Sequence, residues 1–371
     1  MADEERLPAD ESERRRIREE RADTLFVEAG AGSGKTRALV DRIEALVIDD
    51  GIEMESIAAI TFTEKAAAEL RDRIRQRFEG VASERARAAV EQLDSAAVGT
   101  LHSFAQRILN EHPVEAGLPP GVEVLDEIGS QVEFENRWRV FLDELLDDPT
   151  VARSLLIFDA AGVRLDALRT VAVKMAENWD LVEDRMSLEA PEPPPFDRDG
   201  LLQSFEAVLA LRHQCTDPAD ALLARFEAVE ANRTALAEAF DEFDAIAAAT
   251  DMGTRNAARR RVKPGNAGRA ANWPDPKAVR QAVSGLAEVC DDAVAVATTG
   301  ALDHLGARLA RFVLDAAEQR RASGRLEFHD LLVRARRLLR DPEHGPEVRA
   351  ALRGRYTRIL LDEFQDTDPI Q

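Results

Sequence analysis

The sequence contains only two cysteines, Cys215 and Cys290, in 371 residues. Two thiols cannot form the set of disulfides that stabilises small secreted proteins, so we expect stability to come from packing in a reducing cytoplasm. No apolar stretch follows the charged N-terminal residues, and no apolar run approaches the roughly 20 residues of a membrane-spanning helix. These absences predict a cytoplasmic protein with no membrane partner.

Lysine is also scarce, with five residues among the 49 basic side chains, and the net charge is −21. This acidity argues against a nucleic-acid partner, because such binding depends on Lys and Arg contacting phosphates. However, an Ala-rich, Lys-poor and acid-covered surface is also typical of halophilic proteins, in which salt screens the repulsion between like charges. The net charge therefore does not identify the ligand.

One segment, residues 252–274, has no acidic side chain. Its basic residues are Arg255, Arg259, Arg260, Arg261, Lys263 and Arg269. A basic loop of this kind can contact the phosphates of DNA, and we assign that role to Arg259, Arg260 and Arg261. The alternative is a solvated basic turn without a ligand.

A glycine-rich turn near the N-terminus has the pattern of a nucleotide phosphate-binding loop. Its residues are Ala29, Gly30, Ala31, Gly32, Ser33, Gly34, Lys35, Thr36 and Arg37, with Ala29 in a position where the pattern has glycine. Gly30, Gly32 and Gly34 give the backbone freedom to direct N–H groups at a polyphosphate. Lys35 is expected to contact the outer phosphates and Thr36 to hold Mg²⁺. The alternative is a glycine-rich turn with a buried lysine.

Strands and helices alternate in the first 112 residues. We predict strands at 24–27, 57–61 and 96–99, and helices at 11–20, 35–47, 64–78, 83–93 and 102–109. This alternation predicts a parallel sheet covered by helices on both faces. The pattern returns near the C-terminus, with helices at 328–339 and 347–353 and a strand at 359–361.

The middle of the chain has mainly helical patterns. After a possible strand at 122–125, Ser130 and Glu133 form a capping box before a helix at 134–146. Further helices are predicted at 165–177, 201–211, 219–248 and 277–296. We therefore predict a helical domain, 113–310, inserted between two core segments, 1–112 and 311–371.

Asp362 and Glu363 follow the last predicted strand, at the carboxyl end where open parallel sheets bind ligands. Asp362 is predicted to hold Mg²⁺ and Glu363 to polarise the attacking water, while Gln365 can sense the γ-phosphate. Thr36 and Asp362 are 326 positions apart, so the helical block must leave the sheet and return if both contact one nucleotide. A solvated acidic turn is the alternative.

Five motifs resemble those of superfamily 1 DNA helicases of the UvrD/Rep type, and more closely the RecB/AddA-like branch. They are A-G-A-G-S-G-K-T-R at 29–37, T-F-T-E-K-A-A-A-E-L-R-D-R at 61–73, V-G-T-L-H-S-F-A at 98–105, L-E-F-H-D-L-L at 326–332 and L-L-D-E-F-Q-D-T-D-P-I-Q at 360–371. They occur in the order of that family. The resemblance implies a RecA-like P-loop NTPase with an inserted all-helical domain. Such a motor uses ATP and Mg²⁺ to translocate on single-stranded DNA and unwind duplex DNA in repair or recombination.

The resemblance also implies two DNA-contacting elements. The first comprises Thr61, Phe62 and Thr63, with Phe62 stacking on a base, as aromatic faces do without reading sequence. The second comprises Thr100, His102 and Ser103. Alternatives remain open, because Phe62 is also compatible with a core aromatic, His102 with a core or helix-capping histidine, and Arg37 with an exposed helix arginine.

Two departures from the family pattern affect the expected activity. Glu11 stands where relatives often carry an adenine-reading Gln, which leaves the ATP preference open. The sequence ends just after the metal-binding motif, so we expect a truncated or split motor that hydrolyses slowly without an arginine finger and pairs with a C-terminal half or another repair subunit. The alternatives are an ATP- and DNA-binding regulatory fragment and another phosphate-loop ATPase, although the L-S-G-G-Q signature of transporters is absent.

Overall fold

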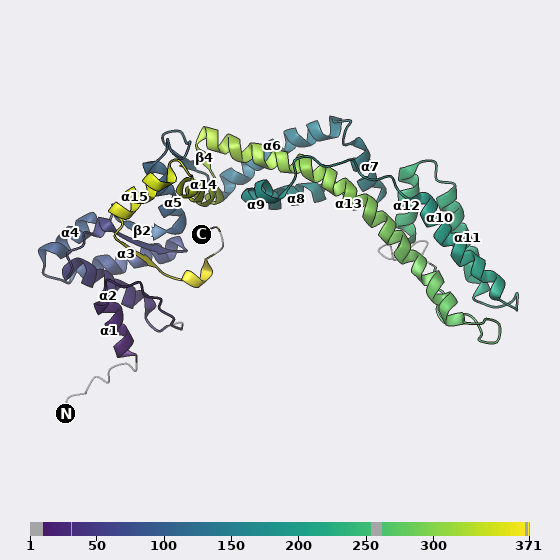
Figure 1. The fold of residues 1–371 in the computed structure, drawn as a ribbon, viewed down its shortest axis with the longest axis horizontal. Coiled ribbons are helices and arrows are strands. Elements are labelled where there is room, and N and C mark those ends of the chain that lie inside the picture. Colours follow the sequence, from purple (N-terminus) through teal and green to yellow (C-terminus); the bar gives the residue numbers. More distant parts are fainter. Residues whose placement is uncertain (1–9, 31, 254–261, 368–369, 371) are drawn as a thin grey trace, which may run out of the picture. The chain divides into compact units, whose positions relative to one another are not determined.

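The computed structural model describes residues 10–30, 32–253, 262–367 and 370. They form two compact units (Figure 1). One unit combines the residues up to Glu127 with those from Gln319 onward, and the other comprises Ile128–Glu318. The first unit is mixed α/β, whereas all the regular elements described in the second unit are helical.

The described elements of the first unit alternate between helix and strand. They are α1 (Glu11–Glu19), α2 (Lys35–Ile48), β1 (Ile57–Thr61), α3 (Glu64–Glu79), α4 (Glu84–Gln92), β2 (Ala97–Thr100), α5 (Leu101–Glu111), β3 (Glu123–Val124), β4 (Arg325–Leu326), α14 (Phe328–Arg340), α15 (Gly345–Arg355) and β5 (Arg358–Leu361). Short 3₁₀ helices lie at Met54–Ser56 and Phe364–Asp366. Most of these bounds agree with the predicted elements within three residues, because caps such as Thr63 and Gly80 define the helix ends locally.

Three strands form a parallel sheet in the order β2-β1-β5, and β3 pairs with β4 in a separate parallel ribbon. The register aligns Thr61 with Thr100 and Ile60 with Leu361. The strand predicted at 24–27 is wrong, since this segment joins no sheet among the described residues. An apolar run without a neighbouring ladder cannot form a strand. Phe26 is instead 78% exposed and lies edge-on to Phe364, with ring centroids 6.3 Å apart.

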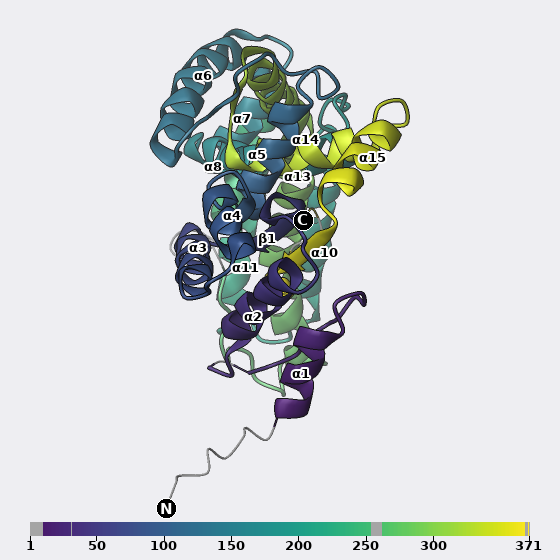
Figure 2. The same cartoon turned by 90° about the vertical axis from the view of Figure 1, so that its left-hand side faces the viewer.

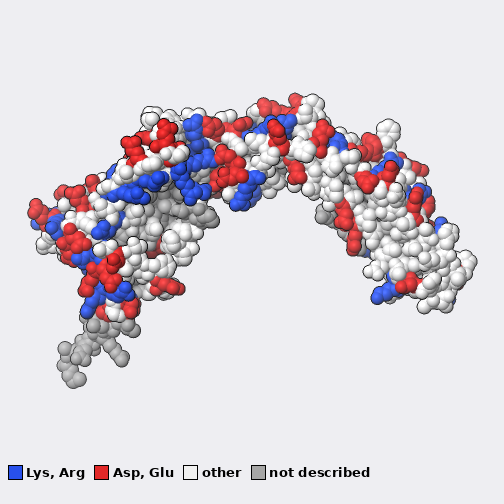
Figure 3. All heavy atoms as spheres, viewed as in Figure 1, with Lys and Arg blue, Asp and Glu red and all other residues white. Residues whose placement is uncertain are grey.

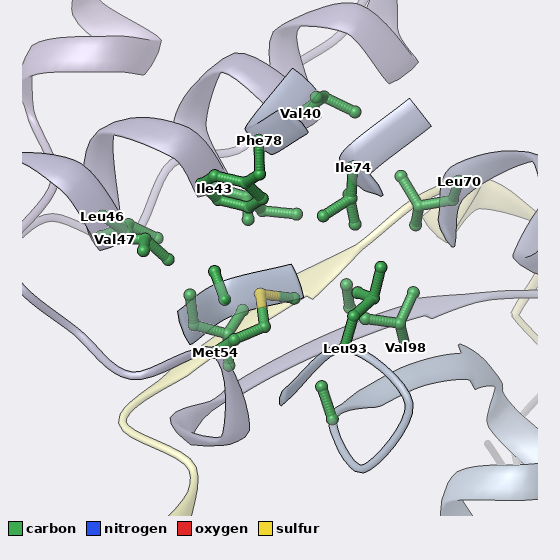
Figure 4. Close-up of a cluster of buried hydrophobic side chains, with 14 of the residues drawn as sticks. Val40, Ile43, Leu46, Val47, Met54, Leu70, Ile74, Phe78, Leu93 and Val98 are labelled. Carbon is green, nitrogen blue, oxygen red and sulfur yellow. The ribbon is translucent and has the colours of Figure 1, made fainter. Parts of the chain in front are cut away.

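Strand β1, the central strand of the sheet, is buried on both faces, whereas Ile359 and Leu361 of β5 are 59% and 44% exposed. Ile57 and Ala59 of β1 pack with apolar residues of α2, α3 and α4, including Ile43, Phe78 and Leu93 (Figure 4). The alternate residues Ala58 and Ile60 belong to a second cluster with Ala97 and Tyr356. This alternation follows from the two-residue side-chain period of a strand and agrees with the predicted covering on both faces at β1, but not along β5.

The motif L-E-F-H-D-L-L at 326–332 forms the start of α14. Asp330, which is fully buried, receives hydrogen bonds from Arg320 Nε at 2.6 Å and from Arg320 Nη2 at 3.0 Å. Its Oδ2 also accepts from the backbone N–H of Glu327 at 2.9 Å, completing a capping box. The motif therefore anchors the start of α14 to the helix that precedes it.

The second unit contains helices only among its described elements (Figure 2). The α-helices are α6 (Glu127–Asp147), α7 (Ala152–Ala160), α8 (Asp166–Ala176), α9 (Trp179–Arg185), α10 (Arg198–Ala210), α11 (Leu223–Ala237), α12 (Glu242–Met252) and α13 (Pro276–Ser323), and a short 3₁₀ helix lies at Leu211–Gln214. Helix α6 starts and helix α13 ends inside the first unit. Aromatic pairs join α6 to α13, with the ring centroids of Phe141 and Phe312 4.6 Å apart. No helix in the described ranges combines the length and apolar character of a bilayer span.

Three helix predictions in this unit were wrong. The helix predicted at 134–146 begins at Glu127, so Ser130 lies inside it and cannot cap it. The predicted helix 219–248 is two helices, because the Asp241 carboxylate accepts from the N–H groups of Phe243 and Asp244 and starts α12. The helix predicted at 277–296 continues to Ser323, since no proline interrupts it before Gly324, whose φ is +70°.

Candidate functional site

The carboxyl ends of the three parallel strands bring the predicted site segments to one edge of the sheet. β1 ends at Thr61, β2 at Thr100 and β5 at Leu361. The backbone N–H of Asp362 donates to the carbonyl of Ile60 at 2.9 Å, which extends the pairing of β5 by one residue. Phe62, His102 and Asp362 therefore follow strand ends that share one edge, where parallel sheets place their ligands.

The glycine-rich turn leads directly into α2, and Gly34 is the N-cap of that helix. Gly32 and Gly34 have φ values of +75° and +90°, which L side chains rarely adopt. Gly30 does not have a positive φ, and its carbonyl accepts from Ser33 N at 3.3 Å and from Ser33 Oγ at 2.7 Å. The free N–H groups at the start of α2 thus border the turn and favour an anion there. Ala31 lies outside the described residues.

Sequence reasoning missed Arg14 as a support of this turn. Its guanidinium donates to the carbonyl of Ser33 at 2.6 Å and to both carboxylate oxygens of Asp10 at 3.0 and 2.9 Å. The spacing of Asp10 and Arg14 predicts their ion pair on a helix. It does not predict that Arg14 also contacts the carbonyl of Ser33, 19 positions further along the chain. Arg14 therefore fixes the turn against α1.

Lys35 and Glu363, 328 positions apart in the sequence, form an ion pair. The Nζ–Oε2 distance is 3.4 Å, and the side chains are 28% and 41% exposed. Gln365 Nε2 donates to the same Glu363 oxygen. This hydrogen bond, followed by the bond and charge of Lys35, holds the pKa of Glu363 below its ordinary value. A carboxylate, an ammonium and an amide therefore meet beside the start of α2.

The backbone at Glu363 is unusual. Its φ of 53° lies in the left-handed region, and no other non-glycine residue in the described ranges has a positive φ. This conformation costs roughly 1–2 kcal/mol per residue, and such strain is concentrated at functional sites. The Glu363 N–H donates to Asp362 Oδ1 at 3.0 Å, which supports the turn. The sequence contains no signal for this geometry.

Thr36 and Asp362 are half-buried, and Arg37 is exposed on the first turn of α2. Hydroxyl and carboxylate oxygens are ligands that suit Mg²⁺, which usually keeps several waters and takes few protein ligands. Among the described residues, no three or more His, Cys, Asp or Glu side chains gather as a metal cage. The oxygen donors of Thr36 and Asp362 fit a hydrated magnesium ion.

Two of the predicted DNA contacts need correction. Thr61 and Thr100 are 1% and 3% exposed, so their side chains have almost no surface for a DNA strand. Thr100 Oγ1 instead accepts from Ser103 N at 3.1 Å and donates to Glu64 Oε1 at 2.9 Å. Both threonines are interior residues at strand ends, which the motif pattern could not distinguish from surface residues.

The remaining predicted DNA contacts are accessible or lie outside the described residues. Thr63 and Ser103 are exposed, and Phe62 is half-buried. His102 lies edge-on to Phe328, with ring centroids 5.6 Å apart, and burial followed by the charge of His329 lowers its pKa. The lowered pKa favours the neutral form of this imidazole. Arg259, Arg260 and Arg261 fall in the segment that is not described.

Comparison with protein families gives one match across nearly the whole chain. The family model described as UvrD/REP helicase N-terminal domain matches residues 10–371. That range includes all the described residues of both compact units and every candidate site residue.

Curated relatives carry helicase names. The chain is 46% identical over 101 residues to DNA helicase II of Haemophilus influenzae, covering 27% of this chain and 13% of that protein. It is 28% identical to an ATP-dependent helicase/nuclease subunit of Moorella thermoacetica, covering 96% of this chain and 28% of the relative. It is 26% identical to the RecBCD enzyme subunit RecB of Escherichia coli, covering 93% and 32%. The chain thus spans less than a third of each of these relatives.

Proposed function

Because the chain belongs to the UvrD/REP helicase N-terminal domain family, we propose that it is the ATP-binding motor domain of an ATP-dependent DNA helicase. It binds ATP, couples hydrolysis to movement along single-stranded DNA and unwinds duplex DNA in repair or recombination. Names of relatives such as DNA helicase II and the RecBCD subunit RecB support the repair and recombination role.

The observation that carries this proposal is the contact between Lys35 and Glu363. An ammonium that follows a glycine-rich turn is suited to the outer phosphates of a nucleotide. A carboxylate 3.4 Å from it is close enough to act on a water beside the same phosphates. Residues from the two ends of the chain thus supply phosphate binding and water activation at one place.

In this proposal each site residue has a defined task. The N–H groups from Gly30 to Gly34 and the start of α2 bind the phosphates, and Arg37 lies close enough in sequence to assist. Thr36 and Asp362 hold Mg²⁺, which neutralises phosphate charge when it is bound. Glu363 orients and deprotonates the attacking water, and Gln365, which donates to Glu363, detects the γ-phosphate.

Single-stranded DNA follows the edge of the sheet beside this site. Phe62 offers an aromatic face to a base, while Thr63, His102 and Ser103 contact the sugar-phosphate backbone. Arg259, Arg260 and Arg261 of the basic segment add phosphate contacts in the helical unit. Lys and Arg also gather over the region of α14 and α15 in the first unit (Figure 3).

We assign the two units different roles. The α/β unit, with the residues up to Glu127 and from Gln319 onward, corresponds to the RecA-like ATP-binding core that was predicted at 1–112 and 311–371. The helical unit, Ile128–Glu318, corresponds to the inserted domain that was predicted at 113–310, and it contributes to DNA binding. The return of β5 to the side of β1, after some 300 intervening residues, supports this discontinuous arrangement.

A phosphate-release assay with MgATP, with and without a single-stranded oligonucleotide, tests this function. The proposal predicts hydrolysis that DNA stimulates and that Lys35→Ala abolishes. Nucleotide binding without any turnover would favour a regulatory module and contradict the motor. Lys174→Ala is the matched control, because Lys174 is an exposed lysine of the second unit that pairs with Glu177.

A further inference from the structure

A cavity of about 430 Å³ opens in the second unit, between the segment 262–265 and the first turns of α13. Three cationic side chains line it, Lys263, Lys277 and Arg280, together with Gln281 and Ser284. No carboxylate belongs to this lining. In a chain with a net charge of −21 and only five lysines, two lysines meet at this one cavity.

One wall of the cavity is a single face of α13. Lys277, Arg280, Gln281 and Ser284 follow the spacing i, i+3, i+4, i+7 and so lie along one side of the helix. The residues that alternate with them pack into the apolar core of the unit, namely Val279, Val283, Leu286 and Cys290. The amphipathic pattern therefore fixes which side chains face the cavity.

The opposite wall belongs to a segment held by interior contacts. The buried Asp220 carboxylate accepts from Arg269 N at 3.0 Å and from Asn272 Nδ2 at 2.9 Å. Trp273 is buried and stacks on Phe226, with ring centroids 6.0 Å apart. In the wall itself Pro264 is buried, and its carbonyl accepts from Ala267 N at 3.1 Å, so this wall has a defined backbone before binding, which lowers the entropy cost.

Neighbouring carboxylates are engaged with backbone donors. Asp275 Oδ1 accepts from the N–H groups of Lys277 and Ala278, both at 2.9 Å, at the start of α13. Asp220 accepts from Leu222 N as well as from Arg269 N. Arg280 Nη1 donates to the carbonyl of Ala267 at 2.9 Å, and this hydrogen bond uses one of the five N–H donors of the guanidinium.

We propose that this cavity binds backbone phosphate groups of single-stranded DNA in the helical unit. The two lysines supply point charges and Arg280 a planar donor group, which together complement phosphate oxygens. This inference rests on the proposed function, since it names a contact for the DNA on which the motor moves. A free polyphosphate or nucleotide offers the same chemistry, and the experiment distinguishes it.

The test measures anisotropy of a fluorescein-labelled single-stranded oligonucleotide at several salt concentrations. The pair Lys263→Ala with Lys277→Ala should weaken binding and make the slope of log affinity against log salt shallower by about 1.4, or about 0.7 for each lost phosphate contact. Lys263→Arg with Lys277→Arg should retain most of the affinity. The control pair, Arg164→Ala with Lys174→Ala, removes two exposed charges of the same unit that already pair with acids, and should leave the slope unchanged.

The proposal would be overturned if Lys263→Ala with Lys277→Ala left the slope of log affinity against log salt unchanged while the variant kept a wild-type circular dichroism spectrum. A variant that loses affinity for inorganic tripolyphosphate but keeps its DNA affinity would assign the cavity to a free polyphosphate, which also overturns it. Failure of the proposed function would appear in a different measurement at the nucleotide site, where Lys35→Ala would leave the ATP affinity unchanged. The two failures are therefore distinguishable.

Discussion

The two units assemble their charged side chains in different ways. In the α/β unit, Lys35 and Glu363 come from distant parts of the chain and meet because strand β5 pairs with β1 beside the start of α2. In the helical unit, Lys277 and Arg280 come from one face of one helix, and Lys263 from the segment just before it. The first arrangement depends on the whole sheet, whereas the second is nearly local. Damage to each unit should therefore affect a different activity.

Separate cores give the largest predicted effect. Phe78 in the first unit and Phe226 in the second are almost fully buried, so each change to Ala should lower the free energy of unfolding by about 3–5 kcal/mol. Calorimetry should reveal two transitions, with each variant shifting mainly one. A single transition that both variants shift equally would contradict separate cores, because the units would then unfold together.

Glu363→Gln separates hydrolysis from binding in the first unit. The variant keeps the shape of the side chain but loses the carboxylate, so hydrolysis should fall by about 10²–10⁴-fold. MgATP affinity and DNA affinity should change little. Rapid-quench assays with labelled ATP measure the rate, and turnover at the wild-type level would argue against the water-activating role.

Phe62→Ala should reduce the affinity for single-stranded DNA by about 1–3 kcal/mol, as expected for the loss of one base stack. Phe240→Ala is a matched control, because Phe240 is a 92% exposed aromatic of the helical unit. Anisotropy titrations measure both variants. Equal DNA affinities would make Phe62 an ordinary aromatic at the end of a strand.

The smallest effect concerns His102. Its pKa is lowered, mainly by burial, so the unfolded chain takes up a proton before the folded protein does. The stabilisation that the neutral histidine adds to the free energy of unfolding is complete above the ordinary pKa of 6.5, and it decreases as the pH falls below that value. Denaturant titrations between pH 5 and about 8 should show a weaker pH dependence for His102→Gln. The same pH dependence in both proteins would refute this assignment.

Local signals predicted much of the α/β unit. The Thr63 cap and Gly80 define α3, buried apolar residues define β1, and the apolar run Ile359 to Leu361 marks β5 although only Leu360 in it is buried, so these elements could be predicted from sequence. The conformation of the segment 24–27 could not be predicted from sequence, because a strand forms only beside a partner strand, and the residues of this segment do not specify one. The continuation of α13 to Ser323 was missed because the weak helical pattern of its Ala-rich half gives no clear end before Gly324.

For the candidate site, the residue types could be predicted but not all their contacts. The glycine turn and the acidic pair indicated that Lys35 and Glu363 would lie close together, and their ion pair agrees with that expectation. The left-handed backbone of Glu363, the support from Arg14 and the burial of Thr61 and Thr100 depend on tertiary packing. Such features arise from residues far apart in sequence and leave no local pattern.

The central claim is that Lys35 and the acidic turn at Glu363 form one nucleotide site. Its most direct test is the affinity for a fluorescent MgATP analogue in the wild type, Lys35→Ala and the control Lys174→Ala. Loss of a charge-assisted contact to phosphate should weaken binding of Lys35→Ala by about 10–100-fold and leave the control unchanged. Equal affinity of all three proteins for the MgATP analogue would show that Lys35 does not belong to a nucleotide site.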